Sequence, residues 1–386
     1  MGTITIGDSC EVLNGYAFKS EKYTSSGIRV IRIANVQKGY IEDDSPVFYQ
    51  TDDVDLNKYM LRENDLLVSL TGNVGRTALL TKDMLPAALN QRVACLRLKT
   101  NKITRGFLFH LLNSDYFESK CIQSSQGVAQ KNLSTEWLKS YDLPLYSLSK
   151  QNEITKILDN VRNTIILKEQ EIQKYDELIK ARFIEMFGSI YDGEYELKTL
   201  PEIVNEDKNA IKRGPFGGAL KKDDFVENGY LVYEQRHAIH NDFDYAKYYI
   251  TQKKYDDMIG FKVVPGDLII SCSGVTLGRI AEVPKGAKEG IINQALLKLS
   301  LNQQIMLNTF FIHQFRGEEI QEILFGFSRG SGIPNMPSMS EVKSVKFICP
   351  PLELQKEYCD FVQQVDKSRF DIKKSIIELE REVVYD

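Results

Sequence analysis

Two long segments of the chain carry apolar residues at alternating spacings of four and three, which predicts coiled-coil helices. The first segment runs from Gln151 to Gly188, a typical C-terminal stop, and the second begins at Gln355. At about 1.5 Å per residue, the first helix is expected to be roughly 55 Å long. The predicted seams consist of Ile154, Leu158, Val161, Ile165, Lys168, Ile172, Tyr175, Ile179, Arg182 and Met186, and of Tyr358, Val362, Val365, Arg369, Ile372, Ile376, Leu379 and Val383. The pattern leaves open two separate amphipathic helices, each lying on its own domain, but the continuous heptads favour a coiled coil.

The remaining segments, about residues 1–148 and 190–352, mix two kinds of pattern. Short alternating or β-branched runs bounded by Gly, Asn and Asp, such as residues 65–70, predict strands. Helical periodicity is expected at about 104–119 and 305–324. Each of these segments is therefore predicted to be an α+β domain.

The same order of residues occurs twice, about 203 positions apart. The run Asn64–Gly72 is followed by Gly75-Arg76, and the run Gly266–Gly274 is followed by Gly278-Arg279, so the second loop has gained one residue. Further pairs at this spacing are Asn90-Gln91 and Asn293-Gln294, His110 and His313, Gly127 and Gly330, and Asn132 and Asn335. A repeat this long indicates duplicated domains rather than a solenoid.

The duplication and the heptads together define the expected domain organisation. The predicted parts are a first domain at 1–148, a central spacer helix at 149–188, a second domain at 189–352 and a C-terminal spacer helix at 353–386.

Composition fits a chain with two or more packed cores, since 42% of its 386 residues are hydrophobic and 26% are charged. No apolar run approaches the length of a membrane span and no secretory signal is recognisable, so a cytoplasmic location is expected. The six cysteines form no C-x-x-C pair, which predicts reduced, mostly buried thiols. The net charge is −4, whereas many DNA-binding proteins are positively charged. A DNA-binding surface on this chain would therefore need its basic residues concentrated in one region.

Taken in order, several short motifs resemble the DNA specificity subunit of type I restriction-modification systems. They are Asn14-Gly15-Tyr16-Ala17-Phe18-Lys19, the strand-loops 65–76 and 267–279, the two Asn-Gln pairs, and the Gly-rich loops at 125–134 and 328–337. Before the second long helix, Pro350-Pro351-Leu352-Glu353-Leu354-Gln355 is similar to the family's Pro-Pro-Leu-x-x-Gln signature. The first copy departs from it, because Tyr146-Ser147 replaces the two prolines.

The resemblance implies two similar target-recognition domains joined by two long antiparallel coiled-coil helices, with pseudo two-fold symmetry. Each domain is expected to read one half of a bipartite, asymmetric DNA target, while the helices set the gap and dock methyltransferase subunits. S-adenosylmethionine, ATP and Mg are expected on methyltransferase and restriction/translocase partner subunits, with no cofactor on this chain. The sequence agrees that the chain is not itself an enzyme, since it has no phosphate-loop motif, no Gly-x-Gly-x-x-Gly and no Asn/Asp-Pro-Pro-aromatic tetrapeptide.

Residues that read DNA must contact phosphates and base edges, where Arg suits guanine and Asn or Gln suits adenine. The predicted DNA-binding residues are Asn73, Arg76, Asn90, Gln91, Arg92, Gln126, Gln130, Lys131 and Asn132 in the first domain, and Arg213, Lys221, Lys222, Arg236, Thr276, Arg279, Asn293, Gln294, Arg329, Ser331 and Asn335 in the second. For the Asn-Gln pairs, a turn or strand-end hydrogen bond is an equal alternative. Because the loops of the two halves differ, the two half-sites are predicted to differ in sequence.

No metal site and no catalytic residue are predicted. His237 and His240 lack the further ligands of a metal set, and a structural role is favoured for His110 and His313. Two other classes of protein stay open at this stage. One is a methyltransferase or nuclease acting alone, and the other is a scaffold of two ligand-binding modules on a coiled-coil spacer.

Overall fold

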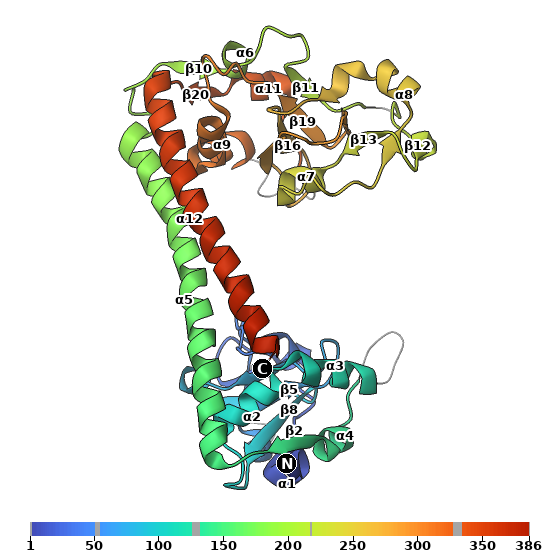
Figure 1. The fold of residues 1–386 in the computed structure, drawn as a ribbon, viewed down its shortest axis with the longest axis vertical. Coiled ribbons are helices and arrows are strands. Elements are labelled where there is room, and N and C mark those ends of the chain that lie inside the picture. Colours follow the sequence, from blue (N-terminus) through green and yellow to red (C-terminus); the bar gives the residue numbers. More distant parts are fainter. Residues whose placement is uncertain (1, 51–54, 126–131, 217, 327–333, 386) are drawn as a thin grey trace. The chain divides into compact units, whose positions relative to one another are not determined.

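The structure, a computed structural model, describes residues 2–50, 55–125, 132–216, 218–326 and 334–385 (Figure 1). The chain divides into two compact units, unit 1 formed by residues 1–166 and 379–386, and unit 2 formed by residues 167–378. Both are mixtures of helix and sheet, so the predicted α+β class is confirmed. The finer boundaries at 148, 188 and 352 stay predictions.

Two helices, α5 and α12, are much longer than the others, at 40 and 34 residues. The helices span α1 Ile6–Ser9, α2 Arg105–Leu112, α3 Asp115–Ser124, α4 Thr135–Ser140, α5 Leu148–Phe187, α6 Leu200–Ile203, α7 Gln235–His240, α8 Gln252–Asp257, α9 Asn308–Arg316, α10 Glu318–Phe325, α11 Met339–Ser344 and α12 Leu352–Tyr385.

Unit 1 contains a four-stranded sheet in the order β2-β8-β5-β6, a three-stranded sheet in the order β4-β3-β7, and the pair β1-β9. Its strands span β1 Gly2–Thr5, β2 Cys10–Asn14, β3 Ile28–Ile31, β4 Phe48–Tyr49, β5 Leu66–Ser69, β6 Thr77–Leu79, β7 Ala87–Leu89, β8 Val93–Leu98 and β9 Asp142–Leu145.

Unit 2 repeats this plan, with a four-stranded sheet in the order β11-β19-β16-β17, a five-stranded sheet in the order β12-β14-β13-β18-β15, and the pair β10-β20. Even the parallel pairing recurs, between β3 and β7 in one unit and between β13 and β18 in the other. The strands span β10 Leu197–Thr199, β11 Ile211–Arg213, β12 Phe225–Val226, β13 Tyr230–Tyr233, β14 Tyr249–Ile250, β15 Lys262–Val263, β16 Leu268–Ser271, β17 Ile280–Glu282, β18 Gly290–Ile292, β19 Leu296–Leu299 and β20 Lys346–Ile348.

One inner strand of each four-stranded sheet, β5 or β16, is buried on both faces. In β5, Leu66 and Val68 pack with helices α2 and α3, while Leu67 packs on the opposite face against the three-stranded sheet. In β16, Ile270 and Ile269 divide between two cores in the same way. This alternation follows from the two-residue period of a strand, and it fixes the register of the sheet.

Helical structure is present where it was predicted, at about 104–119 and 305–324, and each range contains two consecutive helices. In unit 1, the Ser114 hydroxyl accepts a hydrogen bond from the Phe117 amide at 3.2 Å and starts a new helix, α3. In unit 2, Gly317 has φ −61° and ψ 145°, an extended conformation that separates α9 from α10.

The two long helices begin on the same anchor, a fully buried glutamine side chain. Gln151 accepts a hydrogen bond from the Thr104 amide at 2.8 Å and donates to the carbonyls of Lys102 and Tyr146. Gln355 accepts from the Leu307 amide at 2.9 Å and donates to the carbonyls of Ile305 and Pro350. In each copy, the glutamine at the start of the long helix, which ends the Pro-Pro-Leu-x-x-Gln signature in the second copy, therefore ties the first turn of that helix to the adjoining domain.

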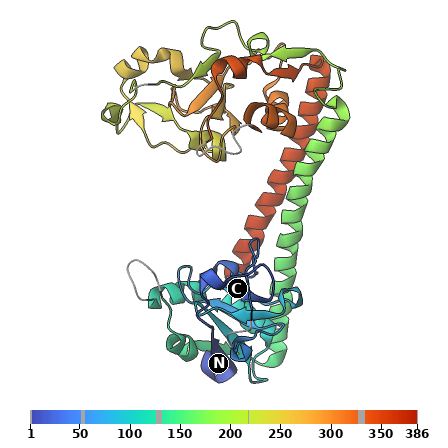
Figure 2. The same ribbon diagram turned by 180° about the vertical axis from the view of Figure 1, so that it is seen from behind.

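Within unit 2, the last part of α5 packs antiparallel to the first part of α12, and both views show them side by side (Figures 1 and 2). Arg182 pairs with Glu357 at 3.0 Å, while the earlier Asp176 pairs with the later Arg369 at 3.0 Å. The predicted seam residues Ile179, Tyr358, Val362 and Val365 are buried between them. The coiled-coil prediction is therefore confirmed over this stretch.

Candidate nucleic-acid interface

In unit 1, three separate loops meet where β5 ends. The Leu70 amide donates to the carbonyl of Arg92 at 2.9 Å, which brings in the turn between β7 and β8. The Leu133 amide donates to the Leu70 carbonyl at 2.8 Å, and Thr71 forms a β-bridge with Asn132. Residues far apart in the sequence therefore form one surface at the end of the sheet.

Unit 2 builds the same surface on equivalent hydrogen bonds, where β16 ends. The Cys272 amide donates to the carbonyl of Ala295 at 2.9 Å, and the Met336 amide donates to the Cys272 carbonyl at 2.8 Å. Ser273 forms a β-bridge with Asn335. We call this surface, in each unit, the loop cluster.

A buried serine holds the main loop of each cluster. The Ser69 hydroxyl donates to the carbonyl of Asn73 and accepts from the Arg76 amide at 3.0 Å. The Ser271 hydroxyl donates to the carbonyl of Thr276 and accepts from the Arg279 amide at 2.9 Å. The loop backbone is thus fixed from inside, which leaves its outward side chains free to differ.

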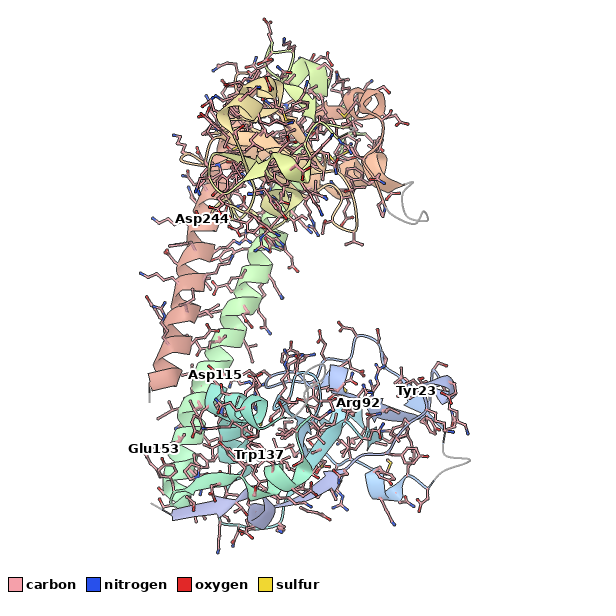
Figure 3. All side chains as sticks on the ribbon, turned by 90° about the vertical axis from the view of Figure 1, so that its right-hand side faces the viewer. Tyr23, Arg92, Asp115, Trp137, Glu153 and Asp244 are labelled. Carbon is pink, nitrogen blue, oxygen red and sulfur yellow. The ribbon has the colours of Figure 1, made fainter. Side chains whose placement is uncertain are left out.

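Most of the predicted DNA-binding residues that the structure describes lie at the surface, and several belong to the loop clusters. Arg92 is labelled in Figure 3. Exposed residues are Asn73, Gln91, Arg92, Asn132, Lys221, Lys222, Arg236, Arg279, Gln294 and Asn335, and partly buried residues are Arg76, Arg213, Thr276 and Asn293. The predicted residues Gln126, Gln130, Lys131, Arg329 and Ser331 lie outside the described residues.

Asn90 and Asn293 use their side chains within the protein. The Asn90 side-chain oxygen accepts from the Arg92 amide at 3.2 Å, and that of Asn293 accepts from the Ala295 amide at 3.0 Å. These are the turn hydrogen bonds that the alternative reading of the pairs expected. The following residues, Gln91 and Gln294, are exposed and remain candidates for DNA contact.

Two predicted arginines have side-chain partners within their own unit. Arg76 donates to the side-chain oxygen of Gln37. Arg213 stacks on Phe216, with 5.6 Å between the guanidinium carbon and the ring centroid. Both groups are therefore oriented before any ligand arrives.

Three predicted basic residues of unit 2 lie on other elements. Arg236, on α7, pairs with Asp242 at 3.6 Å and lies over the ring of Tyr245 at 4.6 Å. Lys221 and Lys222 lie beside β12, an edge strand of the five-stranded sheet. Helix α7 lies next to β16 (Figure 1), so Arg236 is near the loop cluster, whereas the two lysines are at the margin of their sheet.

The positioning role of three residues was not predicted from the sequence, although Gly15 belongs to one of the quoted motifs. Gln235 donates to the Ser273 hydroxyl at 3.1 Å and so joins α7 to the loop cluster. Gly15 and Gly214 occupy equivalent places, since a side chain there would fall 2.2 Å from the carbonyl carbon of Asn90 and 1.8 Å from the carbonyl oxygen of Asn293. The glycine itself was the available signal, but the residues that follow, Tyr16 and Pro215, hid the equivalence.

The histidines have structural contacts. His110 lies 2.8 Å from the Asp159 carboxylate, and His313 lies 3.0 Å from the Tyr358 hydroxyl, so each holds a long helix against its domain. Burial, followed by Arg316 and Arg369, lowers the pKa of His313 to about 4. Both ring nitrogens of His237 contact the backbone. Among the described residues, no group of three or more His, Cys, Asp and Glu is placed to hold a metal ion.

The same loop cluster occurs in two α+β units of one plan, so the chain is a tandem duplication of one domain type. The protein-family model described as "Type I restriction modification DNA specificity domain" matches residues 1–175 and 211–381. The chain therefore belongs to this family. The resemblance noted in the sequence is therefore confirmed.

Individual relatives agree with this assignment. The chain is 34% identical over 164 residues to the EcoAI specificity subunit of Escherichia coli, an alignment that covers 41% of this chain and 28% of that one. It is 22% identical to the EcoBI specificity subunit of Escherichia coli over 97% of this chain and 81% of that one. A solved structure from a study of assembly of the type I R-M system has a TM-score of 0.62 at 16% identity and covers 98% of this chain and 94% of that one, which shows a shared fold.

The described part of the chain contains no helix that is both long and apolar enough to cross a membrane. All six cysteines are free thiols, and four of them are buried, as the sequence predicted.

Proposed function

We propose that this chain is the DNA-binding specificity subunit of a type I restriction-modification enzyme, in which each unit reads one half of a bipartite, asymmetric target. The observation that carries the proposal is the loop cluster itself. The same hydrogen bonds build it twice, yet the exposed side chains differ, as with Asn73 in one unit and Val275 in the other. A constant frame with variable outward residues is suited to reading two different sequences.

In this proposal, charged side chains of the loop clusters contact phosphates and amide side chains contact base edges. Arg76 and Arg279 follow the serine-held loops and are proposed to contact phosphates, which supply most of the salt-dependent affinity. Gln91 and Gln294 are exposed amides, whose donor and acceptor pair matches the major-groove edge of adenine. The negative net charge is compatible with this, because basic residues need to be concentrated only where phosphate lies.

The partners follow from the family. The long helices are proposed to set the gap between half-sites and to dock methyltransferase subunits, which bind S-adenosylmethionine. Restriction/translocase subunits are proposed to supply ATP hydrolysis with Mg. This chain itself carries no catalytic residue in the proposal, and it acts in the cytoplasm, where the DNA target is found.

A competition experiment tests the proposal. The full chain is assembled with its methyltransferase subunits, and an asymmetric bipartite target is selected from random DNA. Two symmetric palindromes, each built from one half-site, then compete with it. The asymmetric target is expected to bind more tightly than either palindrome, whereas an equally tight palindrome would contradict different readings by the two units.

Two further assays, one on this complex and one on the isolated chain, separate the two other classes of protein. A scaffold without DNA specificity would select no sequence from the random pool. A self-sufficient methyltransferase would bind S-adenosylmethionine in the absence of any partner, which radiolabelled cofactor would reveal.

A further inference from the structure

The serine-held loop of unit 2 contains one residue without an equivalent in the loop of unit 1, and the hydrogen bonds identify it. Four positions separate Ser69 from its acceptor Asn73, and five separate Ser271 from its acceptor Thr276. The bridges to Asn132 and Asn335 make Thr71 equivalent to Ser273. The next residues, Gly72 and Gly274, both have positive φ, of 65° and 80°, so they are also equivalent. The additional residue is therefore Val275.

Val275 lies at the tip of the loop cluster, and its surface is 99% exposed. The Leu277 amide donates to the Gly274 carbonyl at 3.1 Å, which closes a turn with Val275 at its second position. A side chain this exposed adds nothing to the core. An isolated apolar residue at a surface is common, but this one is an insertion at the centre of a candidate recognition surface.

The base of the turn is held on several sides. The Gly274 amide donates to the Pro334 carbonyl at 2.9 Å, and the Gly278 amide donates to the Ser271 carbonyl at 2.9 Å. Gln235 holds the Ser273 hydroxyl at 3.1 Å. The base of the turn is therefore fixed before binding, so the loop should lose little conformational entropy when it contacts a ligand.

Ser273, Thr276 and Arg279 on the same loop as Val275 have polar side chains, whereas the other apolar residue of the loop, Leu277, packs against the core. An apolar side chain among them cannot pair with a base donor, a base acceptor or a phosphate. In the major groove, the apolar group that distinguishes one base from the others is the C5 methyl of thymine.

We propose that Val275 contacts the C5 methyl group of a thymine in the half-site read by unit 2, and that it is a specificity-determining residue without a counterpart in unit 1. The inference rests on the proposed function. It adds to that function one named residue, the base it reads and the atom group it touches.

Uracil substitution tests the contact, since exchanging thymine for uracil removes only that methyl group. The full chain with its methyltransferase subunits is titrated with its selected target, in which each thymine of either strand is replaced in turn. Wild type is expected to lose roughly fourfold in affinity at one position of one half-site, the equivalent of one buried methyl group.

In Val275→Ser that loss should disappear, so that thymine and uracil targets bind equally. Val264→Ser is the matched control, because Val264 is 42% exposed and lies before β16, at the opposite end from the loop cluster. This variant is expected to keep the fourfold loss.

Two kinds of failure are distinguishable. Wild type that selects no DNA sequence would refute the proposed function and the inference with it. Wild type that selects a target but tolerates uracil at every position, or has a half-site without thymine, would overturn the inference alone. The same holds if Val275→Ser retains the loss.

Discussion

The buried hydroxyl of Ser271 accepts a hydrogen bond from the backbone amide of Arg279 at 2.9 Å. Ser69 and Arg76 are related in the same way in unit 1, at 3.0 Å. Both serine residues are completely buried. This loop is thus fixed by a group that no ligand can reach, so its outward side chains can differ while its backbone stays the same.

Ser271→Ala should destabilise unit 2, because it leaves the Arg279 amide and the Thr276 carbonyl without this partner. The expected cost is about 1–3 kcal/mol in the free energy of unfolding. Chemical denaturation measures it, and Ser26→Ala, at an exposed position of unit 1, is the control. In DNA binding, Ser271→Ala should weaken the contribution of only one of the two half-sites, because it changes only one unit. Equal stability of Ser271→Ala and the control would show that the hydroxyl does not hold the loop.

Gln355→Ala should destabilise the start of α12, since the fully buried amide makes three hydrogen bonds to the backbone. A loss of about 1–3 kcal/mol is expected, toward the upper end because several backbone groups lose their partner. Gln363→Ala changes an exposed glutamine of the same helix and should have little effect. Similar denaturation midpoints for the two variants would contradict the anchoring role.

Folding stability should depend on the protonation of His313, whose pKa is lowered to about 4 from the ordinary value of 6.5, first by burial. Below about pH 6.5 the unfolded chain binds a proton on this ring, whereas the folded chain does so only near pH 4. Stability should therefore fall as the pH drops through this window, by roughly 3 kcal/mol in all.

Denaturation at a series of pH values checks this contribution. His313→Gln should have a shallower slope between pH 6.5 and 4, while Gln363→Ala, which changes an exposed residue that does not titrate, should keep the wild-type slope. An unchanged slope in His313→Gln would show that this ring does not remain neutral in the folded protein.

Arg279→Gln should weaken DNA binding and reduce its salt dependence. If the guanidinium neutralises one phosphate, the slope of log affinity against log salt becomes shallower by about 0.9. Arg105→Gln is the control, because Arg105 is exposed at the start of α2, away from the loop cluster of its unit. A slope equal to that of wild type would remove Arg279 from the interface.

Much of this structure could be predicted from the sequence, because its largest features are periodic or repeated. The seam residues Ile179, Tyr358 and Val362 are buried as the heptads predicted. The breaks at Ser114 and Gly317 were missed, since apolar periodicity continues across them and a local cap or one glycine ends the helix.

The loop clusters were only partly predictable from the sequence. Arg279 could be found because it is repeated, but its support by Ser271 depends on a hydrogen bond across a loop. Gly214 and Gln235 were missed because their partners, Asn293 and Ser273, are distant in the sequence. Spatial neighbours of this kind leave no mark in the pattern of one chain.

The proposed reading of a split DNA target is tested most directly by mapping methylated adenines across a genome in cells that express this chain with its methyltransferase subunits. The predicted result is one new motif of two different short half-sites with a fixed gap. Ser271→Ala, which disrupts the loop cluster of unit 2, should remove the sequence preference at the half-site read by unit 2 and leave the other half-site unchanged. A well-folded complex that adds no sequence-specific methylation would contradict the proposal.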